Sequence, residues 1–315
     1  MTATCTLTDC GTTEQVELTM ADYSGPVARW CPGCGDHSVL SSVQRLLEKH
    51  QLRPESTVFV SGIGCSSRFP HYLRTYGFHG IHGRALPVST GIKLARPDLD
   101  VFTVMGDGDC CSIGAAHWVH AIRYNVNLVV LLLDNNIYGL TKKQTSPTTP
   151  QGFPSNTQPR GSILPALNPL TATLGVTNAS FVAQTADWAP QHMFETLDAA
   201  FRHPGLAFVR VLQRCPIWTA TIFQGAVRDP ALVEILVHER GIHDPGTEEL
   251  HRHHVHHDPS DLGEARRLAE EGGMKLGLFF HDPSRPRYDE TRRLPGTTAE
   301  QRLAVIEKEL DRHAV

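Results

Sequence analysis

Five short apolar runs, separated by longer amphipathic stretches, constrain the fold of this chain more than any other feature of its sequence. Two of these runs, VFTV and LVVLLL, show almost no polar alternation, which is typical of strands that are covered on both faces. Strands that alternate with helices along a chain form a mostly parallel sheet. The sequence therefore predicts an α/β fold with helices on both faces of the sheet. The predicted strands are residues 57–60, 101–105, 128–133, 181–184 and 207–212.

The helix signals lie between the strands and in the C-terminal third. Apolar residues recur close to every 3.6 positions over residues 38–49, and a Pro-Gly pair follows the stretch at 191–203. Shifts in composition divide the chain into a loose N-terminal arm (1–25), a central domain (26–225) and a C-terminal extension (226–315). Helices are predicted at 38–49, 113–124, 191–203, 262–270 and 299–313, with a further short strand at 276–280.

The charge of the chain limits its partners. Its 315 residues hold 29 Lys and Arg against 33 Asp and Glu, a net charge of −4, which gives no reason to expect nucleic acid or an anionic membrane. The longest aliphatic run, at 128–133, is far shorter than the roughly 20 residues of a membrane-spanning helix. The N-terminus lacks the basic and apolar regions of a signal peptide. We therefore expect a cytoplasmic protein.

Polar clusters follow several of the predicted strands directly. The carboxyl ends of parallel strands meet at one edge of a sheet, and ligands bind there. Asp107 and Asn135 follow two of these strands, and together with the Ile137 carbonyl they offer the hard oxygen ligands that Mg²⁺ prefers. Gly106 and Gly108 allow the backbone to approach phosphates, which the next helix N-terminus also favours. This constellation predicts a site for Mg²⁺ and a diphosphate.

The eight cysteines form a second constellation. Cys31 and Cys34 make a CxxC motif, while Cys65 and Cys215 each follow a predicted strand at the same edge of the sheet. Four thiolates suit zinc or an iron–sulfur cluster equally well by number. A thioredoxin-like redox pair and unrelated buried thiols are the alternatives. No role is predicted for the remaining four, Cys5, Cys10, Cys110 and Cys111.

Long segments of the sequence carry a resemblance to a known family. WCPGCGDHSVL, GIGCSSRFPHYLRTYGFHGIHGRA, GDGDCCSIGAAHW and DNNIYGLTKKQTSPT resemble the β subunit of 2-oxoacid:ferredoxin oxidoreductases, above all the 2-oxoglutarate branch, and GLFFHDPSRPRYDE is similar to the closing segment of that family. The resemblance implies a thiamine diphosphate-binding fold. It implies Mg²⁺ on Asp107, Asn135 and the Ile137 carbonyl, and one [4Fe–4S] cluster on Cys31, Cys34, Cys65 and Cys215.

The same resemblance implies an activity and the residues that serve it. The implied reaction is the ferredoxin-dependent conversion of 2-oxoglutarate and coenzyme A into succinyl-CoA and CO₂. Lys142 is expected to meet the substrate, and Arg68 stands where some relatives carry Lys. Residues implied to line the cofactor are Ile63, Gly64, Cys65, Ser66, Gly108, Asp109, Gly139 and Leu140.

A partner subunit is implied as well. Thiamine enzymes place a Glu on the aminopyrimidine ring, and that Glu comes from a second large domain for which this chain has no room. The resemblance implies an α subunit that supplies it, in an (αβ)₂ assembly, with the C-terminal extension packed on the core and on that subunit. The loop at 145–162 is expected to form either a lid or a contact with the α subunit.

Other functions stay open at this point. Pyruvate or a broad range of 2-oxoacids are alternative substrates, and the direction of the reaction is not fixed. A non-redox thiamine decarboxylase or carboligase would carry zinc or nothing on the cysteines, and an electron-transfer or zinc-stabilised binding module would bind no thiamine diphosphate. The histidine run at 251–257 is predicted to be a solvated surface stretch. One of His71, His79 and His82 is expected to lie near the substrate.

Overall fold

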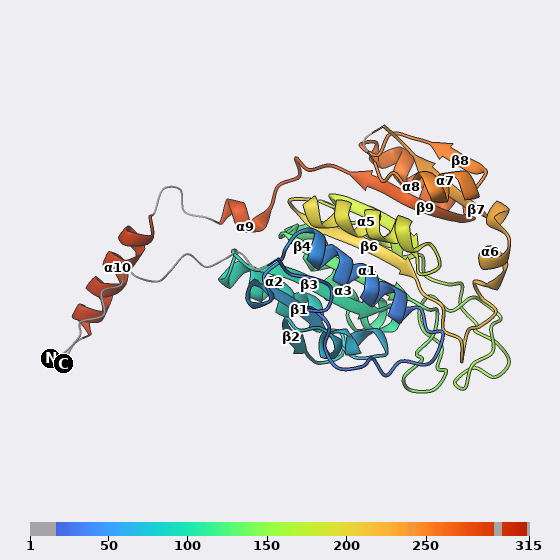
Figure 1. The fold of residues 1–315 in the computed structure, drawn as a ribbon, viewed down its shortest axis with the longest axis horizontal. Coiled ribbons are helices and arrows are strands. Elements are labelled where there is room, and N and C mark those ends of the chain that lie inside the picture. The colour runs from blue at the N-terminus through green and yellow to red at the C-terminus, as the bar shows by residue number, and fades with distance from the viewer. Residues whose placement is uncertain (1–16, 240, 293–297, 314–315) are drawn as a thin grey trace.

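A single nine-stranded sheet organises the molecule (Figure 1). The structure, a computed structural model, describes residues 17–239, 241–292 and 298–313. Most of the N-terminal arm, with Cys5 and Cys10, lies outside the described residues. The strand order is β2-β1-β3-β4-β6-β5-β9-β7-β8. The strands are β1 (Thr57–Ser61), β2 (Tyr76–His79), β3 (Asp100–Gly106), β4 (Leu128–Asp134), β5 (Phe181–Ala186), β6 (Leu206–Leu212), β7 (Val233–Val237), β8 (His253–His256) and β9 (Met274–His281).

The first six strands run parallel, as the sequence predicts. β9 pairs antiparallel with β5, and β7 and β8 continue the sheet in parallel with β9. Residues on both sides of the expected boundary at 225/226 therefore share one sheet. All five strands predicted in the central part of the chain are confirmed, each within two residues of its ends.

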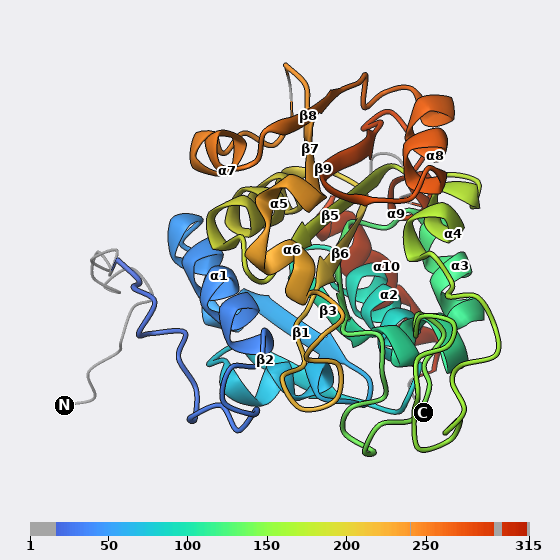
Figure 2. The same ribbon diagram turned by 90° about the vertical axis from the view of Figure 1, so that its right-hand side faces the viewer.

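Helices cover both faces of the sheet, which confirms the predicted fold class (Figure 2). α1 and α5 pack on one face, while α2, α3, α4 and α8 pack on the other. The helices are α1 (Asp36–Lys49), α2 (Ala85–Ala95), α3 (Ala115–Tyr124), α4 (Pro169–Gly175), α5 (Pro190–Arg202), α6 (Gln224–Arg228), α7 (Pro245–Leu250), α8 (Leu262–Glu270), α9 (Tyr288–Thr291) and α10 (Ala299–Arg312).

The central strand β4 shows why the apolar runs form strands. Val129 and Leu131 point into the core beneath α1 and α5, whereas Val130 and Leu132 point into the core beneath α2 and α3. Every residue of β4 is buried. Because successive side chains of a strand face opposite sides, only a strand covered on both faces needs an uninterrupted apolar run.

The C-terminal third differs from the prediction at the histidine run. His253, His254 and His256 are exposed on the edge strand β8, but His251 is only 3% exposed, and its Nδ1 lies 3.0 Å from the Pro230 carbonyl oxygen. The prediction that the histidine run is a solvated surface stretch is therefore wrong at His251. In Figure 1, α10 lies apart from the sheet. No helix of the described residues is long and apolar enough to cross a bilayer.

The carboxyl ends of β1, β3, β4 and β6 meet at one edge of the sheet. Ser61 pairs with Val104, Gly106 with Leu133, and Asp134 with Leu212, so these strands end at nearly the same level. The loops that follow them carry the polar clusters noted in the sequence. This edge is therefore where the site has to be sought.

Candidate functional site

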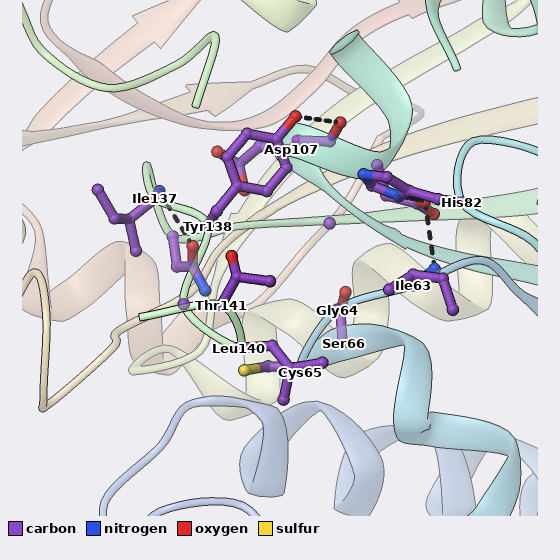
Figure 3. Close-up of a pocket in the computed structure, with 15 residues that line it drawn as sticks. Ile63, Gly64, Cys65, Ser66, His82, Asp107, Ile137, Tyr138, Leu140 and Thr141 are labelled. Atoms are coloured by element: carbon purple, nitrogen blue, oxygen red, sulfur yellow. Dashed lines mark hydrogen bonds and ion pairs between the residues drawn. The ribbon is translucent and has the colours of Figure 1, made fainter. Parts of the chain in front are cut away.

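A cavity of about 110 Å³ lies at this edge, between the loops that follow β1, β3 and β4 (Figure 3). It brings together all the residues expected to bind the cofactor and magnesium. They are Ile63, Gly64, Cys65, Ser66, Asp107, Gly108, Asp109, Asn135, Ile137, Gly139 and Leu140. Of the four cysteines expected to hold the cluster, only Cys65 lines the cavity. His82, Tyr138 and Thr141 line the cavity too.

Asp107 is held by two hydroxyl groups. Its Oδ2 accepts hydrogen bonds from the hydroxyls of Ser146, at 2.5 Å, and Thr148, at 2.7 Å. The residue is 2% exposed. Burial, and after it the charge of the neighbouring Asp134, raises the pKa of the Asp107 carboxyl to about 7. A cation beside this carboxylate would offset the cost of its burial.

The neighbouring residues complete a set of oxygen donors. Asn135 lines the same cavity, and its amide oxygen accepts a hydrogen bond from the Ile137 backbone N–H at 3.2 Å. A buried carboxylate, an amide oxygen and a backbone carbonyl are a donor set that fits Mg²⁺. Among the described residues, no group of three or more His, Cys, Asp and Glu side chains gathers closely enough to hold a metal ion. Such a site therefore depends on further ligands, which a diphosphate and water would provide.

Gly108 brings the backbone close to the cavity. A Cβ at this position would lie 2.1 Å from Cε1 of the Tyr138 ring, which only glycine avoids. The Tyr138 hydroxyl in turn donates a hydrogen bond to the Gly108 carbonyl oxygen at 3.0 Å. The two residues therefore fix each other, and the Tyr138 ring forms this part of the cavity wall.

Asp109 and His82 form a pair on the opposite wall. Oδ1 of Asp109 lies 2.5 Å from His82 Nδ1 and accepts hydrogen bonds from the backbone N–H groups of Gly83, at 2.7 Å, and Ile63, at 3.2 Å. Burial raises the pKa of the Asp109 carboxyl. In Figure 3, His82 and Ile63 lie on the same side of the cavity.

His82 is the one of the three candidate histidines that lines the cavity. His79 is turned away, with its Nδ1 at 2.7 Å from the Ser67 carbonyl oxygen. The His71 ring packs on His79, with their centroids 5.0 Å apart. Of the three histidines that the sequence offered, His82 alone is at the cavity, and its approach to the substrate stays a prediction.

Two hydrogen bonds join the three segments that carry the expected cluster cysteines. Trp30, next to Cys31, donates from its indole N–H to the Cys65 carbonyl oxygen at 2.7 Å. Gly35, next to Cys34, donates to the carbonyl oxygen of Arg214, next to Cys215, at 3.0 Å.

Two of the four thiols have raised pKa values. Burial, followed by the charges of Asp36, Cys215 and Cys31, raises the pKa of the Cys65 thiol to about 12. Burial also raises the pKa of Cys34. The thiols are free, and Cys31 is exposed while Cys215 is buried. A buried thiol with a raised pKa is inert unless an electropositive partner such as a metal favours its thiolate.

The two expected substrate contacts lie outside the cavity wall. Lys142 is exposed and follows Thr141, which lines the cavity. Arg68 lies on the short 3₁₀ segment Ser66–Tyr72, and its Nε donates to the Tyr72 hydroxyl at 2.9 Å. Their roles stay predictions.

Sequence reasoning missed the groups that surround Asp107. Ser146 and Thr148 come from the long loop after β4 and are buried at 4% and 2% exposure. The Thr148 hydroxyl also lies 2.8 Å from Oδ1 of Asp134, which Arg210 holds from the neighbouring strand β6. The sequence did carry a signal, because the stretch from Thr145 to Thr149 is rich in hydroxyl side chains and follows a predicted metal ligand, Asn135.

Known proteins share sequence and fold with this chain. A family model described as the C-terminal TPP-binding domain of thiamine pyrophosphate enzymes matches residues 62–211. The chain is 47% identical over 220 residues to 2-oxoglutarate oxidoreductase subunit KorB of Mycobacterium tuberculosis, covering 70% of this chain and 59% of that protein. It is 37% identical over 271 residues to subunit beta of 2-oxoacid:ferredoxin oxidoreductase 1 of Aeropyrum pernix, covering 83% of this chain and 80% of that protein.

A solved structure is similar over almost the whole chain. It is 2-oxoglutarate:ferredoxin oxidoreductase from Magnetococcus marinus with 2-oxoglutarate, coenzyme A and succinyl-CoA bound, at a TM-score of 0.77 and 36% identity. The match covers 95% of this chain and 93% of that one. The chain spans less than two thirds of the length of some curated relatives, 59% for the Mycobacterium protein and 66% for a Sulfolobus β subunit.

Proposed function

Since the chain belongs to the family of 2-oxoacid:ferredoxin oxidoreductase β subunits, we propose that it is the β subunit of a thiamine diphosphate-dependent 2-oxoglutarate:ferredoxin oxidoreductase. The proposed reaction converts 2-oxoglutarate, coenzyme A and two oxidised ferredoxins into succinyl-CoA, CO₂ and two reduced ferredoxins. Two similar proteins support this choice of substrate, because both are named for 2-oxoglutarate. The proposed location is the cytoplasm, where thiolates stay reduced.

The cavity is the proposed diphosphate end of the cofactor site. Asp107, Asn135 and the Ile137 carbonyl would hold Mg²⁺, because they offer the donors that this cation prefers. Gly108 and Asp109 would lie beside the diphosphate, with Gly139 and Leu140 on the other side of the cavity. When bound, thiamine diphosphate supplies the carbanion that attacks the keto carbon, and an iron–sulfur cluster supplies a one-electron acceptor.

The four cysteines are the proposed ligands of that [4Fe–4S] cluster. The segments of Cys31, Cys34, Cys65 and Cys215 are joined by the Trp30 and Gly35 hydrogen bonds. A cluster at Cys65 would border the cofactor site directly, because Cys65 lines the cavity and its Sγ would lie 3.6 Å from a Cβ built on Gly139. Electrons would therefore leave the site over a short path.

The substrate is proposed to approach from the side of Lys142 and Arg68. A dicarboxylate needs cationic partners for both carboxylates, and an Arg guanidinium binds a carboxylate with two hydrogen bonds. The Tyr72 hydroxyl holds the Arg68 guanidinium, which limits its rotamers before substrate arrives. The proposed contribution of this chain is thus to hold the cationic side chains of Lys142 and Arg68 in position for the carboxylates of the substrate.

An α subunit is proposed to complete the site in an (αβ)₂ assembly. The cavity of about 110 Å³ is smaller than the roughly 300 Å³ at the lower end of ligand pockets. Leu140 on its wall is 48% exposed, as expected of an apolar residue that a partner covers. We propose that the partner supplies the Glu for the aminopyrimidine ring, and that the segment after residue 226 contacts it.

The observation that carries the proposal is the gathering of the expected diphosphate and magnesium residues around one cavity, with Cys65 as the one cluster cysteine on its wall. The test is anaerobic iron and sulfide analysis of the chain purified with its α subunit, followed by assays of coenzyme A-dependent ferredoxin reduction. We expect about four irons and four sulfides per chain, the content of one [4Fe–4S] cluster. We expect a higher kcat/KM for 2-oxoglutarate than for pyruvate. Zinc or no metal would instead favour a non-redox thiamine enzyme, and equal kcat/KM values would favour a broad-range 2-oxoacid enzyme.

A further inference from the structure

Thr148 lies between two buried carboxylates. Its hydroxyl oxygen is 2.7 Å from Oδ2 of Asp107 and 2.8 Å from Oδ1 of Asp134. Both aspartates are buried, at 2% and 0% exposure. A threonine hydroxyl has a single proton, so it can donate to one of these carboxylates only.

The surroundings of Asp134 show which carboxylate receives the proton. Arg210 donates to Asp134 Oδ2 from Nε at 2.8 Å and from Nη2 at 2.6 Å. The backbone N–H and the side-chain amide of Asn136 donate to Oδ1, at 3.1 and 3.2 Å. Asp134 is therefore fully paired without Thr148, whereas Asp107 has no Lys or Arg partner among the described residues. When Asp107 is ionised, as a carboxylate that binds a cation is, the Thr148 proton is therefore needed at Asp107 and not at Asp134.

The Ser146 hydroxyl reaches the same oxygen. It lies 2.5 Å from Asp107 Oδ2, so two hydroxyls donate to this one oxygen. No side chain in the described part of the chain donates to Asp107 Oδ1. The two hydroxyls thus hold the carboxylate in one rotamer and leave Oδ1 without a side-chain donor.

We propose that Ser146 and Thr148 are positioning residues for the cation that Asp107 binds, and that they present Oδ1 as its single ligand atom. The inference rests on the proposed function, because that function places Mg²⁺ on Asp107. The two hydroxyls also attach the long loop after β4 to the site. Lys142 lies on this loop, between the proposed ligand Asn135 and Ser146, which donates a hydrogen bond to Asp107. Binding of the cation and the conformation of the loop are therefore coupled.

The test uses Mn²⁺ as a probe, with free Mn²⁺ measured by electron paramagnetic resonance. The chain is purified with its α subunit and titrated in the presence of thiamine diphosphate. We expect Thr148→Val and Ser146→Ala each to raise the Kd of Mn²⁺ by about tenfold, the usual lower range for groups that orient a metal ligand. Thr148→Ser keeps the hydroxyl and should restore the wild-type Kd.

A matched control lies on the same loop. The Thr145 hydroxyl forms a hydrogen bond of 2.6 Å with the Ser155 hydroxyl and none with Asp107. Thr145→Val should therefore leave the Kd of Mn²⁺ unchanged. Equal Kd values for wild type, Thr148→Val and Ser146→Ala, all folded by circular dichroism, would overturn the inference and leave the proposed function intact. A wild-type complex that binds no Mn²⁺ with thiamine diphosphate would overturn both.

Discussion

The side-chain amide of Asn156 donates a hydrogen bond of 2.6 Å to the carbonyl oxygen of Lys142. Its backbone N–H donates to the carbonyl oxygen of Lys143 at 2.8 Å. Both lysines have left-handed backbone conformations, with φ of +73° and +70°. A residue with a Cβ pays roughly 1–2 kcal/mol for this conformation. Asn156 therefore holds a strained pair of residues beside the candidate site.

The strain at Lys143 can be measured by substitution. Lys143→Gly relieves the left-handed strain, whereas Lys143→Ala keeps it, and both remove the Lys143 contact with the Phe153 ring. We expect the Gly variant to have a free energy of unfolding about 1 kcal/mol above that of the Ala variant. Urea unfolding of both variants checks this. If the Ala variant is as stable as the Gly variant, the strain is not stored at this residue.

Asn156→Ala tests the other half of this arrangement. It removes the amide that binds the Lys142 carbonyl, so the free energy of unfolding should fall by about 1 kcal/mol. The KM for the 2-oxoacid should rise more than kcat falls, because the chemistry is untouched while Lys142 loses its fixed position. Adding Lys143→Gly should recover part of the stability. A change in kcat alone would contradict this account.

The buried ion pair of Arg210 and Asp134 should dominate the stability of this edge. The Arg210 side chain is 14% exposed and that of Asp134 is fully buried. Arg210→Met leaves Asp134 buried without its partner, and we expect a loss of about 3–5 kcal/mol in the free energy of unfolding. Arg202 also pairs with a buried aspartate, Asp198, but the Arg202 side chain is 65% exposed. Arg202→Met should therefore lower the free energy of unfolding by less than about 1 kcal/mol. Equal losses in the two variants would show that burial does not set the strength of these pairs.

How far the sequence predicts this molecule depends on burial. β1, β3 and β4 are covered on both faces, so their apolar runs mark them clearly. β2 was missed because Tyr76–His79 is only four residues long and every one of them is exposed. β8 was missed because its residues are nearly all histidine. α2 was missed because Pro87, Gly91 and β-branched residues weaken its helix propensity.

The same limit applies to the candidate site. Asp107 and Asn135 directly follow predicted strands, so topology alone places them at one edge. Ser146 and Thr148 reach Asp107 across 39 and 41 residues through a loop without periodic structure. The path of such a loop is set by tertiary hydrogen bonds, which no local pattern reveals. The long loop was expected to be a lid or a partner contact, and the structure adds an anchoring role.

Stability should fall in mild acid because of buried histidines. Burial lowers the pKa of His192 from 6.5 to about 4. The unfolded chain therefore takes up a proton below pH 6.5 that the folded chain refuses until about pH 4, and stability is lost as the pH falls through this window. At pH 5 this residue alone should cost about 2 kcal/mol relative to pH 7.5.

Urea unfolding at pH 7.5 and pH 5 measures this effect. His192→Asn should reduce the loss between the two pH values, whatever its effect on the absolute stability. His120→Asn is the control, because His120 is exposed on α3 and should leave the loss unchanged. The same pH dependence in His192→Asn and wild type would assign the loss to other groups.

Gly108 should be intolerant of any side chain. A Cβ there would lie 2.1 Å from Cε1 of Tyr138, so Gly108→Ala displaces the ring and breaks its hydrogen bond to the Gly108 carbonyl. We expect Gly108→Ala to weaken thiamine diphosphate binding, measured by isothermal titration calorimetry of the complex with its α subunit. Adding Tyr138→Ala makes room for the new methyl group and should restore part of the affinity. Gly91→Ala is the control, because nothing lies within 4 Å of its Cβ. An unchanged affinity in Gly108→Ala would show that the cofactor does not approach this wall.

The proposed cluster separates the cysteines into two classes. Cys215→Ser removes a proposed ligand, and we expect iron and sulfide to fall sharply in anaerobically purified protein, together with the broad visible absorption of the cluster. Cys110→Ser changes a cysteine that is also buried but belongs to the apolar core beneath α2 and α3, and should keep the full iron content. The comparison separates ligation from burial, because both cysteines are buried. Equal iron contents in the two variants would remove Cys215 from the ligand set and leave the cluster with a different fourth donor.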